Sequence, residues 1–156
     1  MVRKGPGTTD NYTTEGRAEI HKTLGDSIDV SIMHFLMRNP VQHQSTAYND
    51  NRISLFCSQF GKCAVTGAKL EIGDIHCHHI LPKEFGGTDI YSNLVIVSID
   101  VHRLVHATNP ETIRKYWVNL QLNSKQLKTL NKFRNLANVE CLECDAINTL
   151  MASRMN

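Results

Sequence analysis

Four histidines between residues 78 and 106 constrain the fold of this chain more than any other feature. His78 and His79 end a β-favouring segment, and His102 and His106 stand four residues apart in a segment with a helical pattern. Residues i and i+4 share one face of a helix, so both imidazoles can reach one metal ion. A third nitrogen ligand from a strand would leave coordination positions open, as catalytic metal sites require. The sequence therefore predicts a strand, a long loop, a strand and a helix around a metal ion.

The segments around this unit predict the rest of an α+β fold. Turn signals at Gly67 and Gly73 give residues 62–80 the look of a hairpin, and the β-branched run 94–98 predicts a strand. Asp100 is expected to cap the helix that carries the histidine pair. Further helices are expected at 15–25, 27–40, 52–61, 110–120 and 124–137, with Pro110 and Ser124 as their starting signals in the last two.

Composition along the chain predicts three parts. The polar segment 41–51 looks like a linker, so residues 1–50 are expected to form a partly disordered N-terminal extension. Residues 51–140 are expected to form the compact domain. Residues 141–156 are a tail that carries a CxxC motif.

Charge and hydropathy narrow the class of protein. The chain has 156 residues, enough to bury a core, and its net charge of +2 permits a nucleic-acid partner without demanding one. No apolar run follows the basic start, and no stretch approaches the roughly 20 apolar residues of a membrane span. We expect a cytoplasmic protein without a membrane partner, in which the five cysteines are thiols or metal ligands.

The pattern of the four histidines resembles the HNH nuclease family, whose fold is a ββα-metal finger. The resemblance lies in "HHILP" (78–82), "GGTDIYSNLVIV" (86–97) and "VHRLVHA" (101–107), in the family's order and spacing. It implies a fold class of ββα-metal finger with flanking helices. It also implies a metal-dependent endonuclease that hydrolyses phosphodiester bonds in DNA.

The resemblance assigns a role to each matching residue. His78, His102 and His106 correspond to the metal ligands, and His79 to the general base that activates water. Asn93 corresponds to the residue that bridges the loop and holds His79 in its orientation and tautomer. The implied cofactor is a divalent metal, with Mg²⁺ or Mn²⁺ expected first and Zn²⁺ or Ni²⁺ as alternatives. Cleavage would leave a 5′-phosphate and a 3′-hydroxyl.

Residues 39–67 and 93–107 also resemble the C-terminal part of group II intron-encoded reverse transcriptase/maturases. In such proteins the HNH module nicks double-stranded DNA, and the new 3′ end primes reverse transcription. This chain has no YADD-type polymerase motif, so reverse transcription is not expected of it. Intron RNA or a separate reverse transcriptase is expected as a partner instead. The alternative is a truncated remnant that binds nucleic acid without cutting it. A purely structural metal domain is disfavoured because structural sites are typically closed by thiolates.

The residues around the motif carry weaker expectations. Lys83 and Arg103 flank the site and could bind phosphate, although solvated surface charge is an alternative. His76 is expected to face solvent on the strand, with a role as a fourth metal ligand as the alternative. The CxxC motif suggests a structural Zn²⁺ site as an alternative to unpaired thiols, with ligands drawn from Cys63, Cys77, Cys141 and Cys144.

Overall fold

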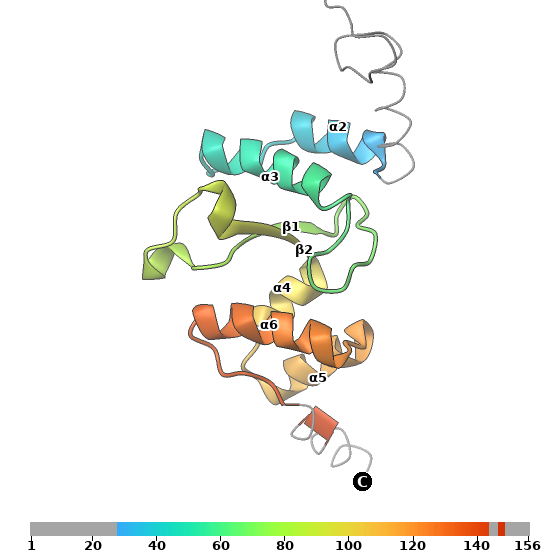
Figure 1. Ribbon diagram of the computed structural model, residues 1–156, viewed down its shortest axis with the longest axis vertical. Helices are drawn as coiled ribbons and strands as arrows, with labels where there is room; N and C mark the ends of the chain where they lie inside the picture. Colours follow the sequence, from blue (N-terminus) through green and yellow to red (C-terminus); the bar gives the residue numbers. More distant parts are fainter. Residues whose placement is uncertain (1–27, 144–146, 149–156) are drawn as a thin grey trace, which may run out of the picture.

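The computed structural model describes residues 28–143 and 147–148. Within these residues the protein is a mixed α/β fold of five helices and one two-stranded antiparallel sheet. The sheet lies between two helical layers (Figure 1), with α2 and α3 on one side and α4, α5 and α6 on the other. The elements are α2 (Val30–Arg38), α3 (Thr46–Ser58), β1 (Ile75–His79), β2 (Leu94–Ser98), α4 (Ile99–His106), α5 (Pro110–Leu120) and α6 (Ser124–Leu136).

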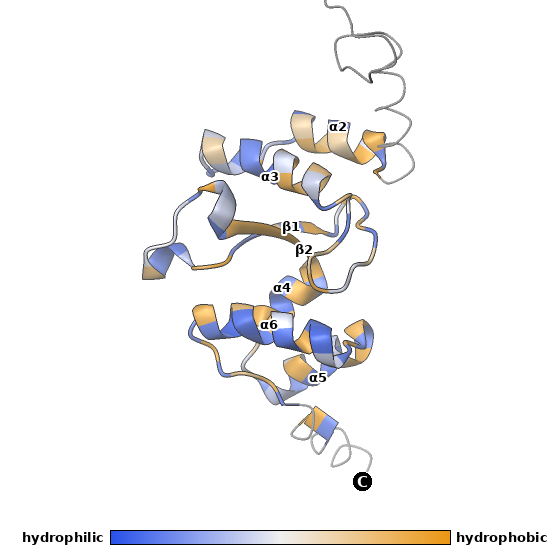
Figure 2. Ribbon diagram, viewed as in Figure 1, coloured by the Kyte–Doolittle hydropathy of each residue, from blue (hydrophilic) through white to orange (hydrophobic). Residues whose placement is uncertain are grey.

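The sheet pairs β1 with β2, in a register that sets Ile75 opposite Ser98 and His79 opposite Leu94. The β2 sequence LVIVS is apolar along its length (Figure 2), and Ile96 and Val97 are fully buried. A strand covered by helices on both faces buries its residues on both sides, which explains this continuous apolar run. The strand predicted at 94–98 is therefore confirmed.

The hairpin expected within residues 62–80 does not form. Residues 62–72 are mostly turns, with one isolated bridge between Lys62 and Lys69, and β1 pairs instead with β2. Gly67 and Gly73 have positive φ, as their turn signals predicted, but the turns at these glycines do not join two strands. The reason is that β2 offers β1 a longer and more apolar partner than the segment before it.

The helix that carries the histidine pair begins earlier than expected. Ser98 caps α4, because its hydroxyl oxygen accepts a hydrogen bond from the Val101 N–H at 3.2 Å. Asp100, the expected cap, lies instead in the first turn, where its charge favours the positive end of the helix dipole. The starts predicted at Pro110 and Ser124 are confirmed.

The boundary expected at residue 50 is wrong, because it falls inside α3. Ser45 caps this helix, and α3 buries Tyr48 and Phe56 in the same core that takes Ile32 of α2. Some of the polar residues of 41–51 that suggested a linker lie on the exposed face of α3. The expectations for residues 1–27, including the helix at 15–25, lie outside the described residues.

Candidate active site

The alternation of β1 places two sets of residues on opposite faces of the sheet. His76 and His78 face α4, where the His78 ring centroid lies 5.4 Å from that of His102 and 5.5 Å from that of His106. His79 faces the other side, and its ring lies 5.3 Å from that of Tyr48 in α3. The strand ends at His79, as the sequence analysis required.

The position of α4 is fixed by its apolar face and by one buried cation. Val101, Leu104 and Val105 are fully buried, so His102 and His106 lie on the face that meets β1. Arg134 of α6 is also buried and donates hydrogen bonds to the Leu104 and Ala107 carbonyl oxygens at the end of α4. These carbonyls have no partner within the helix, so Arg134 satisfies groups that burial would otherwise leave unpaired.

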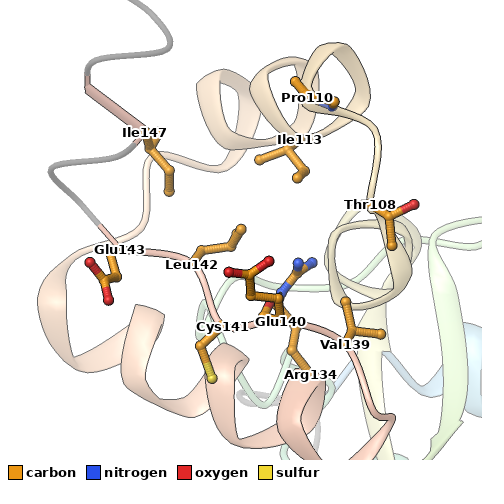
Figure 3. A pocket seen from close by; sticks show the side chains of 10 residues that line it. All are labelled: Thr108, Pro110, Ile113, Arg134, Val139, Glu140, Cys141, Leu142, Glu143 and Ile147. Carbon is orange, nitrogen blue, oxygen red and sulfur yellow. The ribbon is translucent and has the colours of Figure 1, made fainter.

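A pocket of about 430 Å³ lies beside Arg134 (Figure 3). It is lined by Thr108, Pro110, Ile113, Arg134, Val139, Glu140, Cys141, Leu142, Glu143 and Ile147. Arg134 also donates a bond to the Glu140 main-chain oxygen, so its guanidinium is engaged with main-chain groups. The pocket therefore lies next to a structural cation and contains none of the four motif histidines.

The residues that face α4 form a histidine cluster whose nitrogens fit a metal ion. Ligand nitrogens of His76, His78 and His102 lie within 4.8 Å of one another, and these three residues could hold an ion. The buried nitrogens His78 Nε2 and His102 Nδ1 have no hydrogen-bond partner. A buried polar atom without a partner costs free energy, and a metal ion would remove that cost.

Burial keeps these imidazoles neutral at neutral pH. Burial, followed by the neighbouring imidazoles, lowers the pKa of His76 to about 4 and the pKa values of His78 and His102 to about 3. The pKa of His106 is lowered by the same burial effect. Neutral imidazole is the form that binds metal, so the site is ready to coordinate without first losing protons.

The expectation that His76 faces solvent is wrong. Its side chain is half-buried, and its ring stacks on that of His102 with centroids 3.6 Å apart and planes 28° apart. Imidazole lone pairs lie in the ring plane, so two nearly parallel stacked rings cannot both point at one ion. Although its nitrogen is close to the others, the His76 ring in this orientation covers the His102 ring and does not share a metal ion with it.

His106 lies beside the same cluster, in edge-on ring contact with His78 and His102. Imidazoles that share one ion, each with a nitrogen about 2.1 Å from it, have ring centroids about 5 Å apart. The centroids of His78, His102 and His106 are 4.8 to 5.5 Å apart in edge-on pairs, with planes at 61° to 70°. His106 is exposed at the rim and is not in the group whose ligand nitrogens all lie within 4.8 Å of one another, so its ring would have to turn to share an ion with His78 and His102.

On the opposite face, the His79 ring is held by a carboxylate that the sequence analysis did not single out. His79 Nε2 lies 2.7 Å from Asp89 Oδ1, and the Ser45 hydroxyl donates to Asp89 Oδ2 at 2.6 Å. The bond from Ser45, followed by that from His79, holds the pKa of Asp89 below its usual value. Asp89 stands in the motif "GGTDIYSNL", so the sequence contained it without showing what it contacts.

Asn93 closes the loop between the strands. Its Oδ1 accepts from the Leu81 N–H at 2.9 Å, and its Nδ2 donates to the carbonyls of Leu81 and Thr88 at 3.0 and 2.8 Å. The closure leaves no room at Gly87, where a Cβ would lie 1.7 Å from the Leu81 oxygen. The loop-bridging part of the role expected for Asn93 is present, but the side-chain hydrogen bond to the His79 ring comes from Asp89.

The two expected phosphate-binding residues differ in their surroundings. Lys83 is exposed, and its Nζ lies 3.6 Å from Asp89 Oδ1 and 3.3 Å from Gln44 Oε1, beside His79. Arg103 donates to the Tyr116 hydroxyl at 3.3 Å and lies over the Tyr116 ring. Lys83 therefore faces the His79 side of the site, whereas Arg103 is engaged with α5.

The cysteines do not assemble into a site within the part of the chain that is described. Cys63 and Cys77 lie in the core and Cys141 is exposed, while Cys144 lies outside the described residues. Burial raises the pKa of Cys77 to about 11, so its thiol stays protonated. The histidine cluster is the one group of three or more potential metal ligands in residues 28–143 and 147–148. The structural zinc site, the alternative to unpaired thiols, therefore has no support from Cys63, Cys77 and Cys141.

Fold and site together define a mixed α/β protein with a histidine cluster that could hold a metal ion. Comparison with protein-family models, with curated proteins and with solved structures gave no match for this chain. Among the described residues, the helices are too short or too polar to cross a membrane.

Proposed function

We propose that this protein is a metal-dependent DNA endonuclease with a ββα-metal core made of β1, β2 and α4. The observation that carries the proposal is a pair of buried, unpartnered imidazole nitrogens, His78 Nε2 and His102 Nδ1. They come from β1 and α4, and His78 is followed directly by His79, whose ring is held by a carboxylate. Metal ligands and a held histidine within one strand–helix unit suit the hydrolysis of a phosphodiester.

His78, His102 and His106 would hold the divalent ion, and His76 would cover the ring of His102. A bound ion would stabilise negative charge on the scissile phosphate and on the leaving 3′ oxygen. Imidazole ligands suit first-row transition ions as well as or better than Mg²⁺, so Mn²⁺, Ni²⁺ and Zn²⁺ belong in any test beside Mg²⁺.

His79 would act as the general base. Its Nε2 is engaged with Asp89, and no group among the described residues bonds to Nδ1. Nδ1 is therefore the nitrogen that can take a proton from water, a transfer that typically contributes 10² to 10⁴ in rate. Lys83, exposed on the same side, would attract the phosphate backbone and hold it near His79.

The substrate we propose is double-stranded DNA, of which one strand is nicked. The resemblance to group II intron proteins suggests that the nick serves intron mobility, with intron RNA or a separate reverse transcriptase as partner. The proposed cleavage itself uses only residues of this chain.

A plasmid-nicking assay tests the proposal. Supercoiled plasmid is incubated with wild type or His79→Ala, with Mg²⁺, Mn²⁺, Ni²⁺ or Zn²⁺, and with EDTA. We expect wild type to convert supercoiled to open-circular DNA only with metal, and His79→Ala to lose at least about 100-fold in rate. The matched control is His34→Ala, which removes an exposed histidine of α2 and should leave the rate unchanged. Equal rates for His79→Ala and wild type would refute the role of His79. DNA binding without nicking under any metal would indicate a binding module instead.

A further inference from the structure

The loop between the strands places a carboxylate against His79, the motif histidine that lies on the α3 face of the sheet. His79 Nε2 and Asp89 Oδ1 are 2.7 Å apart, and both side chains are only 16% exposed. A carboxylate only accepts hydrogen bonds, so a neutral His79 that bonds to it carries its proton on Nε2. Its lone pair then lies on Nδ1.

Asp89 is itself held from two directions by α3 and the residue that caps it. The Ser45 hydroxyl donates to Asp89 Oδ2 at 2.6 Å, and the Asn51 amide donates to the Asp89 main-chain oxygen at 2.8 Å. The same Ser45 hydroxyl oxygen caps α3 by accepting from the Tyr48 N–H at 3.0 Å. The position of the carboxylate is therefore tied to the first turns of a helix that is packed in the core.

The other side of the His79 ring is restrained by the same helix. The Tyr48 ring lies nearly parallel to the His79 ring, at 24°, and the Tyr48 hydroxyl donates to the Cys77 carbonyl of β1 at 2.7 Å. Tyr48 is buried, so its ring forms a fixed wall. Tyr48 and Asp89 therefore restrain the imidazole from two sides.

We propose that Asp89 is the positioning residue of the active site: it fixes His79 as the Nε2–H tautomer, so that Nδ1 is the nitrogen that accepts a proton from water. The role of Nδ1 as the base rests on the proposed nuclease function. The assignment of the Nε2–H tautomer does not depend on that function. Without the carboxylate, the two tautomers of neutral imidazole interconvert through solvent, and the ring can turn about its χ angles. Only a fraction of molecules would then present a basic nitrogen to the water.

The first experiment measures the tautomer without any activity. Histidine ring ¹⁵N spectra of the full-length, metal-free chain are recorded at a pH at which the His79 ring is neutral, with the His79 signal assigned by its loss in His79→Ala. We expect a protonated Nε2 and an unprotonated Nδ1 in wild type, and averaged shifts that indicate mixed tautomers in Asp89→Ala. The matched control is Asp50→Asn, a change to an exposed aspartate of α3, which should leave the His79 signal unchanged. Identical His79 signals in wild type and Asp89→Ala would overturn the proposal.

The second experiment measures the effect on cleavage. We expect Asp89→Ala to lower kcat for nicking by about 10- to 100-fold. This is the range seen when a metal-binding histidine loses the group that accepts a hydrogen bond from its other ring nitrogen. KM for plasmid and metal affinity should stay within about two-fold, because Asp89 is not among the proposed ligands. Asp89→Asn should recover part of the loss, because its amide oxygen can still accept from Nε2–H. An unchanged kcat in Asp89→Ala would overturn the catalytic role.

These experiments separate the two proposals. If wild type does not nick DNA, the nuclease function fails while the ¹⁵N spectra still decide whether Asp89 sets the tautomer. If Asp89→Ala does not fold, as judged by its thermal unfolding, the spectra of Asp89→Asn decide the question instead. In that case a fixed Nε2–H tautomer with a largely retained kcat would support an acceptor at residue 89 as the group that sets the tautomer, and mixed tautomers with an unchanged kcat would overturn the assignment.

Discussion

Asn93→Ala is the substitution that most directly tests how the loop between the strands is held. The change removes three side-chain hydrogen bonds, which join Asn93 to the Leu81 N–H, the Leu81 carbonyl and the Thr88 carbonyl. Each intramolecular bond contributes about 1 kcal/mol net. The bond to Thr88 is exposed, so water replaces part of it, and we expect the free energy of unfolding to fall by about 2 to 3 kcal/mol.

The assay is urea unfolding of the metal-free protein, followed by circular dichroism and supported by thermal scans. In a chain of this size, each kcal/mol shifts Tm by about 2 to 4 °C, so a fall of about 5 to 10 °C is expected. The matched control is Asn119→Ala, an exposed asparagine on α5, for which we expect a change within about 0.5 kcal/mol.

Asn93→Asp sharpens the test because it conserves volume and removes only the donor. The carboxylate can still accept from the Leu81 N–H, but it then faces the carbonyl oxygens of Leu81 and Thr88 without a proton to share. We expect it to destabilise the protein at neutral pH at least as much as Asn93→Ala does. A loss of less than about 0.5 kcal/mol in both variants would refute the reasoning that Asn93 holds the loop.

Four further substitutions test the metal centre and the packing around it. His106→Ala should weaken Zn²⁺ or Ni²⁺ binding in calorimetric titrations by at least about tenfold. His76→Ala should weaken it less, because the stacked His76 ring cannot share an ion with His102. A larger loss of affinity in His76→Ala than in His106→Ala would contradict this order. Arg134→Leu leaves three main-chain carbonyls without their donor. Each lost hydrogen bond costs about 1 kcal/mol or more, so the free energy of urea unfolding should fall by roughly 3 kcal/mol. An unchanged urea midpoint would show that water replaces Arg134. Gly87→Ala should lower Tm by several degrees, because its Cβ would overlap the Leu81 oxygen, and a wild-type Tm would mean that the loop can open without cost.

Much of the central unit could be predicted because its signals are local. The β-branched run of β2, the helical spacing of His102 and His106, and the proline at the start of α5 each act within a few residues. The misassignments arose where a choice between partners was needed. Residues 62–72 had the local signals of a hairpin arm, but β1 pairs with β2, whose residues are more deeply buried.

The boundary error has a related cause. The segment from 41 to 51 is polar, which suits a linker, yet Ser45 caps a helix there and the guanidinium of Arg52 donates to the Leu36 and Asn39 carbonyls at the end of α2. Such a buried arginine is polar in the sequence and structural in the fold. Composition cannot distinguish a buried arginine from a solvated one, because the buried one depends on carbonyl oxygens at the end of another helix.

By itself, the sequence determined which histidines could share a face. The helical period puts His102 and His106 together, and strand alternation turns His79 away from His78, because main-chain geometry sets both periods without tertiary contacts. Only the tertiary structure decided that His76 stacks on His102, that Asp89 reaches His79 across a loop, and that Ser45 and Tyr48 hold that pair from α3. These contacts join segments that are far apart along the chain. The packing of the sheet against α3 and α4 sets the distances and angles between their side chains, which the local sequence pattern does not define.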